Sequence, residues 1–98
     1  MSNKVKDIAY DFFYHQMNMP GKLAYIKKVM ESCNTKDQLD QVKAWGHNRL
    51  CEARSLVDKK FNHLDSIKFI RVFNYVHKRV NMMQNEITDL YNKKSLKV

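Results

Sequence analysis

The sequence predicts an all-α domain, a small bundle of about four helices whose last two form a long antiparallel hairpin. Apolar residues recur at helical spacing along most of the 98 residues. The chain holds 2 Gly and 1 Pro, too few for the tight turns of most β-rich folds or for a glycine-rich phosphate loop. Apolar residues make up 44% and charged residues 29%, which excludes a disordered polyelectrolyte. This length predicts a single domain.

The first helix is expected at about residues 3–18. The Met-Pro-Gly sequence at residues 19–21 is expected to end it, because proline cannot continue a helix and glycine favours a bend. Apolar residues cover two faces of this helix. Either the bundle buries the second face, or that face binds a protein partner or a second copy of the chain. The second face consists of Tyr10, Phe13, Tyr14 and Met17.

The second helix is expected at about residues 22–33 and the third at about residues 36–62. Between them, Thr35 and Gln38 have the spacing of a capping box, which predicts a helix start directly after Thr35. Gly46 lies on the apolar stripe of the third helix. A glycine in this position predicts close approach by a neighbouring helix rather than a turn.

The fourth helix is expected at about residues 67–92, with Asp65 or Ser66 as its cap. A basic tail follows at residues 93–98. The apolar residues of this helix alternate four and three positions apart, the pattern of a coiled-coil seam. Large aromatic residues on the seam favour packing against the third helix over self-association. The seam consists of Phe69, Phe73, Val76, Val80, Met83, Ile87 and Leu90.

The sequence predicts neither catalysis nor a bound metal or cofactor. His47 and Cys51 stand four residues apart on one helix, but no third group that would orient them is apparent. Structural zinc sites usually have two close-spaced pairs of ligands, and the sequence offers one, His47 with Cys51. With a polar start and no long apolar run, the chain is expected to be cytoplasmic, with no secretory signal and no membrane span. Its cysteines, Cys33 and Cys51, are expected to be reduced thiols.

Positive charge concentrates in the last third of the chain, since residues 66–98 carry seven basic and two acidic side chains. Basic residues that flank a tyrosine suit nucleic acid, because cations contact phosphates and an aromatic ring stacks on an unpaired base. We therefore expect RNA or DNA to be bound, mainly through phosphates. The candidate residues are Lys43, Arg54, Lys68, Arg71, Tyr75, Lys78 and Arg79.

A protein partner is the alternative. The aromatic face of the first helix or the basic surface would then bind an acidic host protein, and the chain would act as an inhibitor or adaptor. A third interpretation gives the basic residues only a solubilising role. Self-association into a homodimer through the first helix stays open as well.

Residues 26–45, with the sequence IKKVMESCNTKDQLDQVKAW, resemble a helical hairpin of small accessory proteins from T-even-like tailed phages. The resemblance rests on Cys33 at a helix end, the capping box that begins at Thr35, and the Gln-Leu start of the next helix. It implies a non-enzymatic protein of the bacterial cytoplasm. Such a protein would bind host or phage nucleic acid, or block a host enzyme or defence system.

Overall fold

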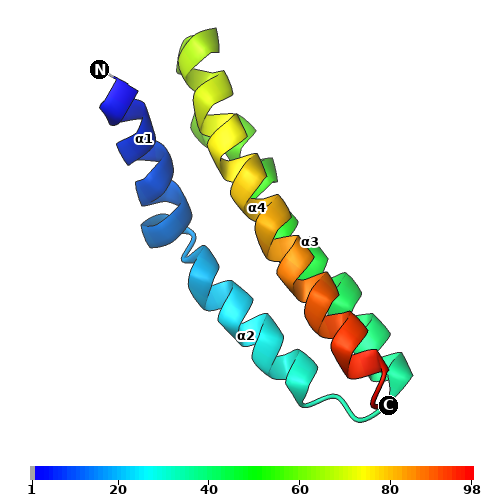
Figure 1. Cartoon of the computed structure of the whole chain (residues 1–98). Helices are drawn as coiled ribbons and strands as arrows, with labels where there is room; N and C mark the ends of the chain where they lie inside the picture. Colours follow the sequence, from blue (N-terminus) through cyan, green and yellow to red (C-terminus); the bar gives the residue numbers. More distant parts are fainter. Residues whose placement is uncertain (1) are drawn as a thin grey trace.

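The computed structural model describes residues 2–98, with side chains from residue 5 onward, and this range is all-α (Figure 1). The two longest helices lie side by side, and the shorter helical segments follow one another along one side of that pair (Figure 1). In chain order the elements are α1 (Ser2–Tyr10), the π-helical stretch η1 (Asp11–Gln16), α2 (Met19–Glu31), α3 (Lys36–Lys60) and α4 (Ser66–Ser95).

The bundle is three helices across rather than the bundle of about four that the sequence predicted. At 1.5 Å per residue, α3 with 25 residues and α4 with 30 residues are about 38 and 45 Å long. The stretch formed by α1 and η1, and α2 after it, are each about half that length, and they lie end to end along the hairpin (Figure 1). A section through the described residues therefore cuts three helices, and the molecule measures 50 × 19 × 18 Å.

The chain bends between η1 and α2 at Asn18, earlier than the expected break at residues 19–21. Asn18 adopts a left-handed backbone conformation, with φ 47° and ψ 52°, which asparagine tolerates better than most residues. Pro20 lies in the first turn of α2, where its missing N–H costs no helical hydrogen bond. A Cβ atom on Gly21 would lie 2.5 Å from the side-chain nitrogen of Asn18, so a larger residue there would displace the Asn18 side chain.

The π-helical turn changes which residues of the first helix face the core. A π-helix closes its hydrogen bonds from residue i to i+5, and the amide of Met17 accordingly donates to the carbonyl of Phe12 at 2.9 Å. The wider turn lets both Phe12 and Phe13 point inward, and both are fully buried. Phe13 therefore belongs to the core, which is the first of the two alternatives that the sequence left open for this face.

Two local sequence signals are confirmed. A Cβ atom on Gly46 would lie 2.6 Å from Cγ2 of Ile26, so α2 and α3 approach each other closely at this glycine. The hydroxyl of Thr35 accepts a hydrogen bond from the amide of Gln38 at 3.2 Å and caps α3. The Gln38 side chain accepts from the amide of Asn34 at 2.9 Å, one residue before the amide that a standard capping box would use.

The inward face of α4 differs from the expected seam at its N-terminal end. Val72 is fully buried, whereas Phe69 and Phe73 are only partly buried and stack on each other with ring centroids 6.3 Å apart. The slim valine fits between the helices, and the two larger rings lie at the edge of the core. Further along, the seam is buried as expected, with Val76, Val80, Met83 and Ile87 in the core.

Both ends of α4 are held by side-chain contacts. Asp65 caps the start, and its carboxylate accepts a hydrogen bond from the amide of Lys68 at 2.9 Å. At the other end α4 continues to Ser95, so the first part of the expected basic tail is helical. Lys94 donates to the backbone carbonyl of Glu31 and lies 3.9 Å from its carboxylate, which joins the ends of α4 and α2.

Candidate functional site

A groove of about 560 Å³ lies between α1 and α4. On the α1 side, Val5 and Ala9 have short side chains that leave space in front of α4, whereas the phenylalanines of η1 fill the interior. We call this hollow the α1–α4 groove. Its lining consists of Val5, Lys6, Ala9, Arg71, Asn74, Tyr75, Lys78 and Arg79.

Among the residues whose side chains the structure describes, the lining of the α1–α4 groove contains four cations and no carboxylate. Lys6 comes from α1, and the other three come from two turns of α4. The ion pairs among the described residues all involve other side chains. Cations held together without a counter-charge raise the local positive potential, so an anion in the groove is attracted by all of them.

Tyr75 lies at the centre of this charged lining. The guanidinium of Arg79 stands over its ring, 3.6 Å from the centroid, so one face of the ring is already covered. Burial raises the pKa of Tyr75; Arg79 opposes this effect, and the phenols of Tyr14 and Tyr10 reinforce it. The hydroxyl therefore stays protonated at neutral pH and is available as a donor.

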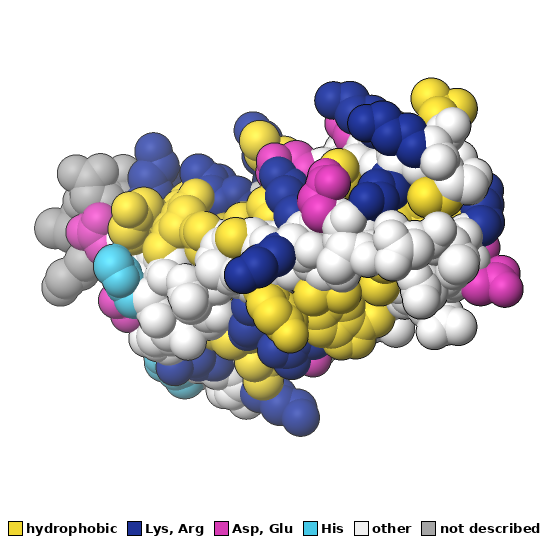
Figure 2. All heavy atoms as spheres, turned by 90° about the horizontal axis from the view of Figure 1, so that it is seen from below, with side chains coloured by type: hydrophobic (Ala, Val, Ile, Leu, Met, Phe, Trp, Pro, Cys, Tyr) yellow, Lys and Arg dark blue, Asp and Glu magenta, His cyan; other side chains and the backbone are white. Residues whose placement is uncertain are grey.

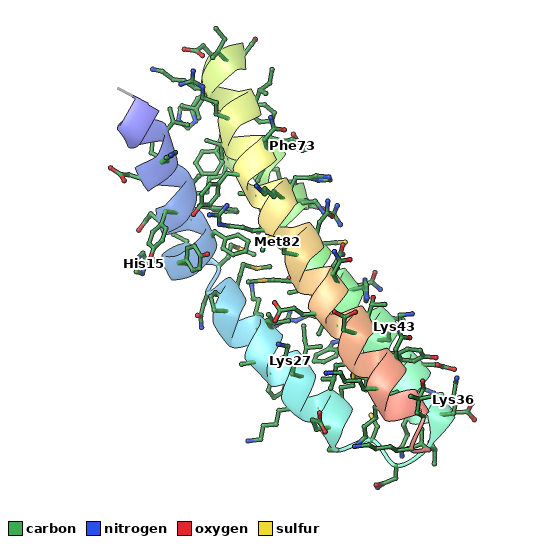
Figure 3. The ribbon with its side chains drawn as sticks, in the orientation of Figure 1. His15, Lys27, Lys36, Lys43, Phe73 and Met82 are labelled. Carbon is green, nitrogen blue, oxygen red and sulfur yellow. The ribbon has the colours of Figure 1, made fainter. Side chains whose placement is uncertain are left out.

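A second hollow of about 430 Å³ adjoins the α1–α4 groove and shares Lys78 and Arg79 with it. Figure 3 shows Met82 on the part of α4 that faces η1. Toward α2 the hollow reaches Glu86, which forms an ion pair with Lys27 at 2.8 Å. We call it the adjoining hollow, and its lining consists of Phe13, Tyr14, Lys78, Arg79, Met82, Met83 and Glu86.

Three of the seven residues expected to bind nucleic acid lie outside the groove. The ammonium of Lys68 lies 3.9 Å from the carboxylate of the cap residue Asp65. The ammonium of Lys43 lies over the ring of Tyr91, 4.4 Å from its centroid, in a cation–π contact between α3 and α4. Arg54 is also held between these two helices. The structure brings the other four together in the groove lining: Arg71, Tyr75, Lys78 and Arg79.

Arg54 departs furthest from the expectation, because its donors contact α4 and its own helix. Its Nη2 atom donates to Sγ of Cys51 at 3.0 Å and to Oε1 of Gln84 at 3.3 Å. Its Nη1 atom lies 3.4 Å from both Nδ1 of His77 and Oδ1 of Asn81. Arginine only donates, so the contact with His77 requires a lone pair on Nδ1. The N–H groups of Arg54, which the sequence suggested would contact phosphates, join α3 to α4.

More polar side chains continue this row along the hairpin. The amide nitrogen of Gln84 donates to Sγ of Cys51 at 3.1 Å and to the backbone carbonyl of His47 at 3.4 Å. The hydroxyl of Thr88 lies 3.4 Å from Nε2 of His47, whose pKa is lowered by burial and by Lys43. We call this row the α3–α4 polar seam; it consists of His47, Cys51, Arg54, His77, Asn81, Gln84 and Thr88.

The aromatic face expected on the first helix is not an open surface. Phe13 is buried, and Tyr14 and Met17 pack partly buried against the core. Tyr10 is 51% exposed, and its ring lies 4.4 Å from that of Tyr14. Because Tyr14 lines the adjoining hollow, the remaining exposed part of this face borders the basic groove. The two sites that the sequence suggested separately thus meet between α1 and α4.

Lys6 is the groove residue that sequence reasoning missed. The sequence holds a signal for it, because Lys6 follows the core residue Val5 and precedes Tyr10 by one helical turn. Positive charge alone does not select the site, since Figure 2 shows Lys and Arg side chains spread widely over the face seen from below. The property that selects the α1–α4 groove is a lining with several cations and no acidic partner.

The part of the chain that the structure describes contains no group of three or more His, Cys, Asp or Glu residues placed to hold a metal ion. Within residues 2–98, no helix has the length and apolar character needed to cross a membrane. Cys33 is a buried free thiol, and Cys51 is a free thiol in the α3–α4 polar seam.

No family model matches the chain, and neither a curated protein nor a solved structure gives a match. The resemblance of residues 26–45 to phage accessory proteins therefore stays a prediction.

Proposed function

We propose that the protein is a small, non-enzymatic nucleic-acid-binding protein that contacts phosphates in the α1–α4 groove. The observation that carries this proposal is the groove lining, which presents four cations without a carboxylate. Lysine and arginine side chains bind phosphates by charge and by hydrogen bonds, and these contacts depend little on base sequence. If residues 26–45 are related to phage accessory proteins, this activity belongs to a phage factor acting in the bacterial cytoplasm.

Salt dependence follows directly from the proposal. Each neutralised phosphate releases counterions, so the logarithm of the binding constant falls with the logarithm of salt concentration by about 0.7 to 0.9 per contact. Four contacts therefore predict a slope of about −3 to −4. Lys6, Arg71, Lys78 and Arg79 are the side chains expected to make them.

Fluorescence anisotropy with labelled oligonucleotides at low salt tests the proposal. The double variant Arg71→Glu with Lys78→Glu reverses two groove charges and is expected to weaken binding by about a hundredfold or more, because attraction becomes repulsion. The matched control is Lys28→Glu with Lys97→Glu, which makes the same charge change at two exposed residues outside the groove. Circular dichroism checks that both variants remain helical. Equal loss of affinity in the two double variants would contradict a site in the groove.

The same groove would also attract an acidic protein, the other partner expected from the sequence. A pull-down from bacterial lysate with and without nuclease separates the two partners. Nucleic-acid binding predicts that co-purifying material absorbs at 260 nm and disappears after nuclease treatment. A discrete protein that survives nuclease and is lost with Arg71→Glu and Lys78→Glu would favour the protein-binding alternative.

A further inference from the structure

An exposed aromatic ring stands beside the α1–α4 groove. Tyr10 lies one helical turn after Lys6, which lines the groove, and four residues before Tyr14, which lines the adjoining hollow. Tyr10 is 51% exposed, and the centroid of its ring lies 4.4 Å from that of Tyr14, at an angle of 36°. Among the described residues Tyr10 belongs to neither lining, so it stands at the rim of the two hollows.

Tyr10 is better placed than Tyr75 to accept a stacking ligand. Tyr75 is only partly exposed, and Arg79 covers one face of its ring at 3.6 Å. The ring of Tyr10 also has neighbours, Tyr14 at 4.4 Å and His15 at 5.8 Å between centroids, but half of the residue's surface stays open to solvent. A flat, open ring next to cations is the combination by which proteins bind single strands, because cations follow the backbone while unpaired bases stack on the ring.

The spacing of the cations suits a short stretch of backbone. Arg71 and Lys78 are seven residues apart on α4, which corresponds to about 10.5 Å along the helix. This distance is short enough for both cations to contact phosphates of one short stretch of backbone. A base from such a stretch then lies close to the rim where Tyr10 stands.

We propose that the α1–α4 groove binds single-stranded nucleic acid in preference to duplex, with an unpaired base stacked on Tyr10 and the neighbouring phosphates on Lys6, Arg71 and Lys78. This inference rests on the proposed nucleic-acid-binding function and adds the class of strand. In a duplex the bases are stacked on one another and their faces cannot reach Tyr10, so a duplex uses the cations alone.

The test compares three labelled probes of one sequence: single-stranded DNA, single-stranded RNA and duplex DNA. Each probe strand is about 12 nucleotides long, which lies within the site sizes of single-strand-binding modules. The wild-type protein is expected to bind both single strands at least fivefold more tightly than the duplex. The variant Tyr10→Leu keeps an apolar side chain without a ring, and it should lose fivefold or more for both single strands while duplex affinity changes less than about twofold. Tyr10→Phe should retain wild-type binding.

Tyr25→Leu is the matched control, because Tyr25 is 60% exposed on α2 and packs on Trp45 rather than at the groove. This variant should leave binding of all three probes unchanged. Equal affinity for single strand and duplex, or binding unaffected by Tyr10→Leu but lost with Arg71→Glu and Lys78→Glu, would overturn the strand preference and leave the proposed function standing. Failure of all three probes to bind at low salt would overturn both. If Tyr10→Leu weakens binding of only one of the two single strands, the stacking site is specific for that nucleic acid, RNA or DNA.

Discussion

The two sides of α4 use positive charge in opposite ways. On the side that faces α3, the guanidinium of Arg54 contacts four side chains and joins the hairpin. On the side that faces α1, the ion pairs of the described residues leave out Arg71 and Lys78, which line an open groove. A cation with several nearby acceptors stabilises the fold, whereas a group of cations without acceptors is free to bind an anion.

Among single substitutions, the largest effect is expected from removing the cation of the α3–α4 polar seam. Arg54→Ala should lower the free energy of unfolding by about 1 to 2 kcal/mol, because partly buried acceptors such as those of Cys51 and Gln84 lose their donor. Urea denaturation followed by circular dichroism measures the change. Arg49→Ala is the control, since Arg49 is exposed and its 3.5 Å ion pair with Glu52 contributes little. Equal losses in the two variants would show that the seam does not stabilise the hairpin.

In the α1–α4 groove, removal of a cation is expected to weaken binding while stability changes little. Arg71→Ala should weaken nucleic-acid binding about fivefold, roughly 1 kcal/mol, since one phosphate contact is lost. Its free energy of unfolding should change by about 0.5 kcal/mol or less, as is usual for an exposed side chain. Anisotropy and urea denaturation on the same samples test both statements. If Arg54→Ala weakens binding as much as Arg71→Ala does while the protein stays folded, the division between the two sides of α4 fails.

The free energy of unfolding should also depend on pH through both sides of α4, at acid pH through the side that faces α3 and at alkaline pH through the side that faces α1. Burial, and secondly Lys43, lower the pKa of His47 below 6.5, so the folded protein takes up this proton less readily than the unfolded chain. Stability should therefore be highest above about pH 6.5 and fall as pH drops through the lowered pKa. Burial raises the pKa of Tyr75 above 10.0, so the unfolded chain releases this proton more readily than the folded protein does. The free energy of unfolding should therefore fall as pH rises from about 10 through that raised value.

Urea denaturation of His47→Gln and Tyr75→Phe at several pH values measures these contributions. His47→Gln should flatten the acid limb of the stability profile and leave the alkaline limb unchanged. Tyr75→Phe should do the reverse. An acid limb that is identical in wild type and His47→Gln would mean that protonation of His47 does not affect the hairpin.

The smallest effect is expected for the one groove cation on α1. Lys6→Ala should reduce the slope of the logarithm of affinity against the logarithm of salt by about 0.7 to 0.9, because a single phosphate contact is removed. Affinity at low salt should fall only a few-fold. A series of titrations at increasing salt gives the slope. A slope equal to that of the wild type would show that bound nucleic acid follows α4 without contacting α1.

Sequence patterns placed Arg71, Tyr75 and Lys78 on one side of α4, because residues four and three apart share a helix face, and the structure has all three in the groove lining. The sequence prediction also counted Lys43 and Arg54 among the binding residues. The structure places these two against α4, because spacing along α3 does not tell which side chains on α4 lie opposite.

The α3–α4 polar seam was present in the sequence as a pattern. Residues 77, 81, 84 and 88 are polar and three or four positions apart on α4, and residues 47, 51 and 54 follow the same steps on α3. Two polar rows of this kind on the arms of a predicted hairpin indicate pairing between helices. The first helix offered no comparable signal for η1, since the π-helical turn that buries Phe13 departs from the 3.6-residue period.

The sequence by itself determined the features that depend on neighbours along the chain. These are the helical content, the cap at Thr35, the close approach at Gly46 and the group of cations on one side of α4. Only the tertiary structure decided which cations have partners, because Arg54 and Gln84 are 30 residues apart in the chain and Lys6 meets α4 across the bundle. Local periodicity specifies the face on which a side chain lies, and the packing of helices specifies what that face meets.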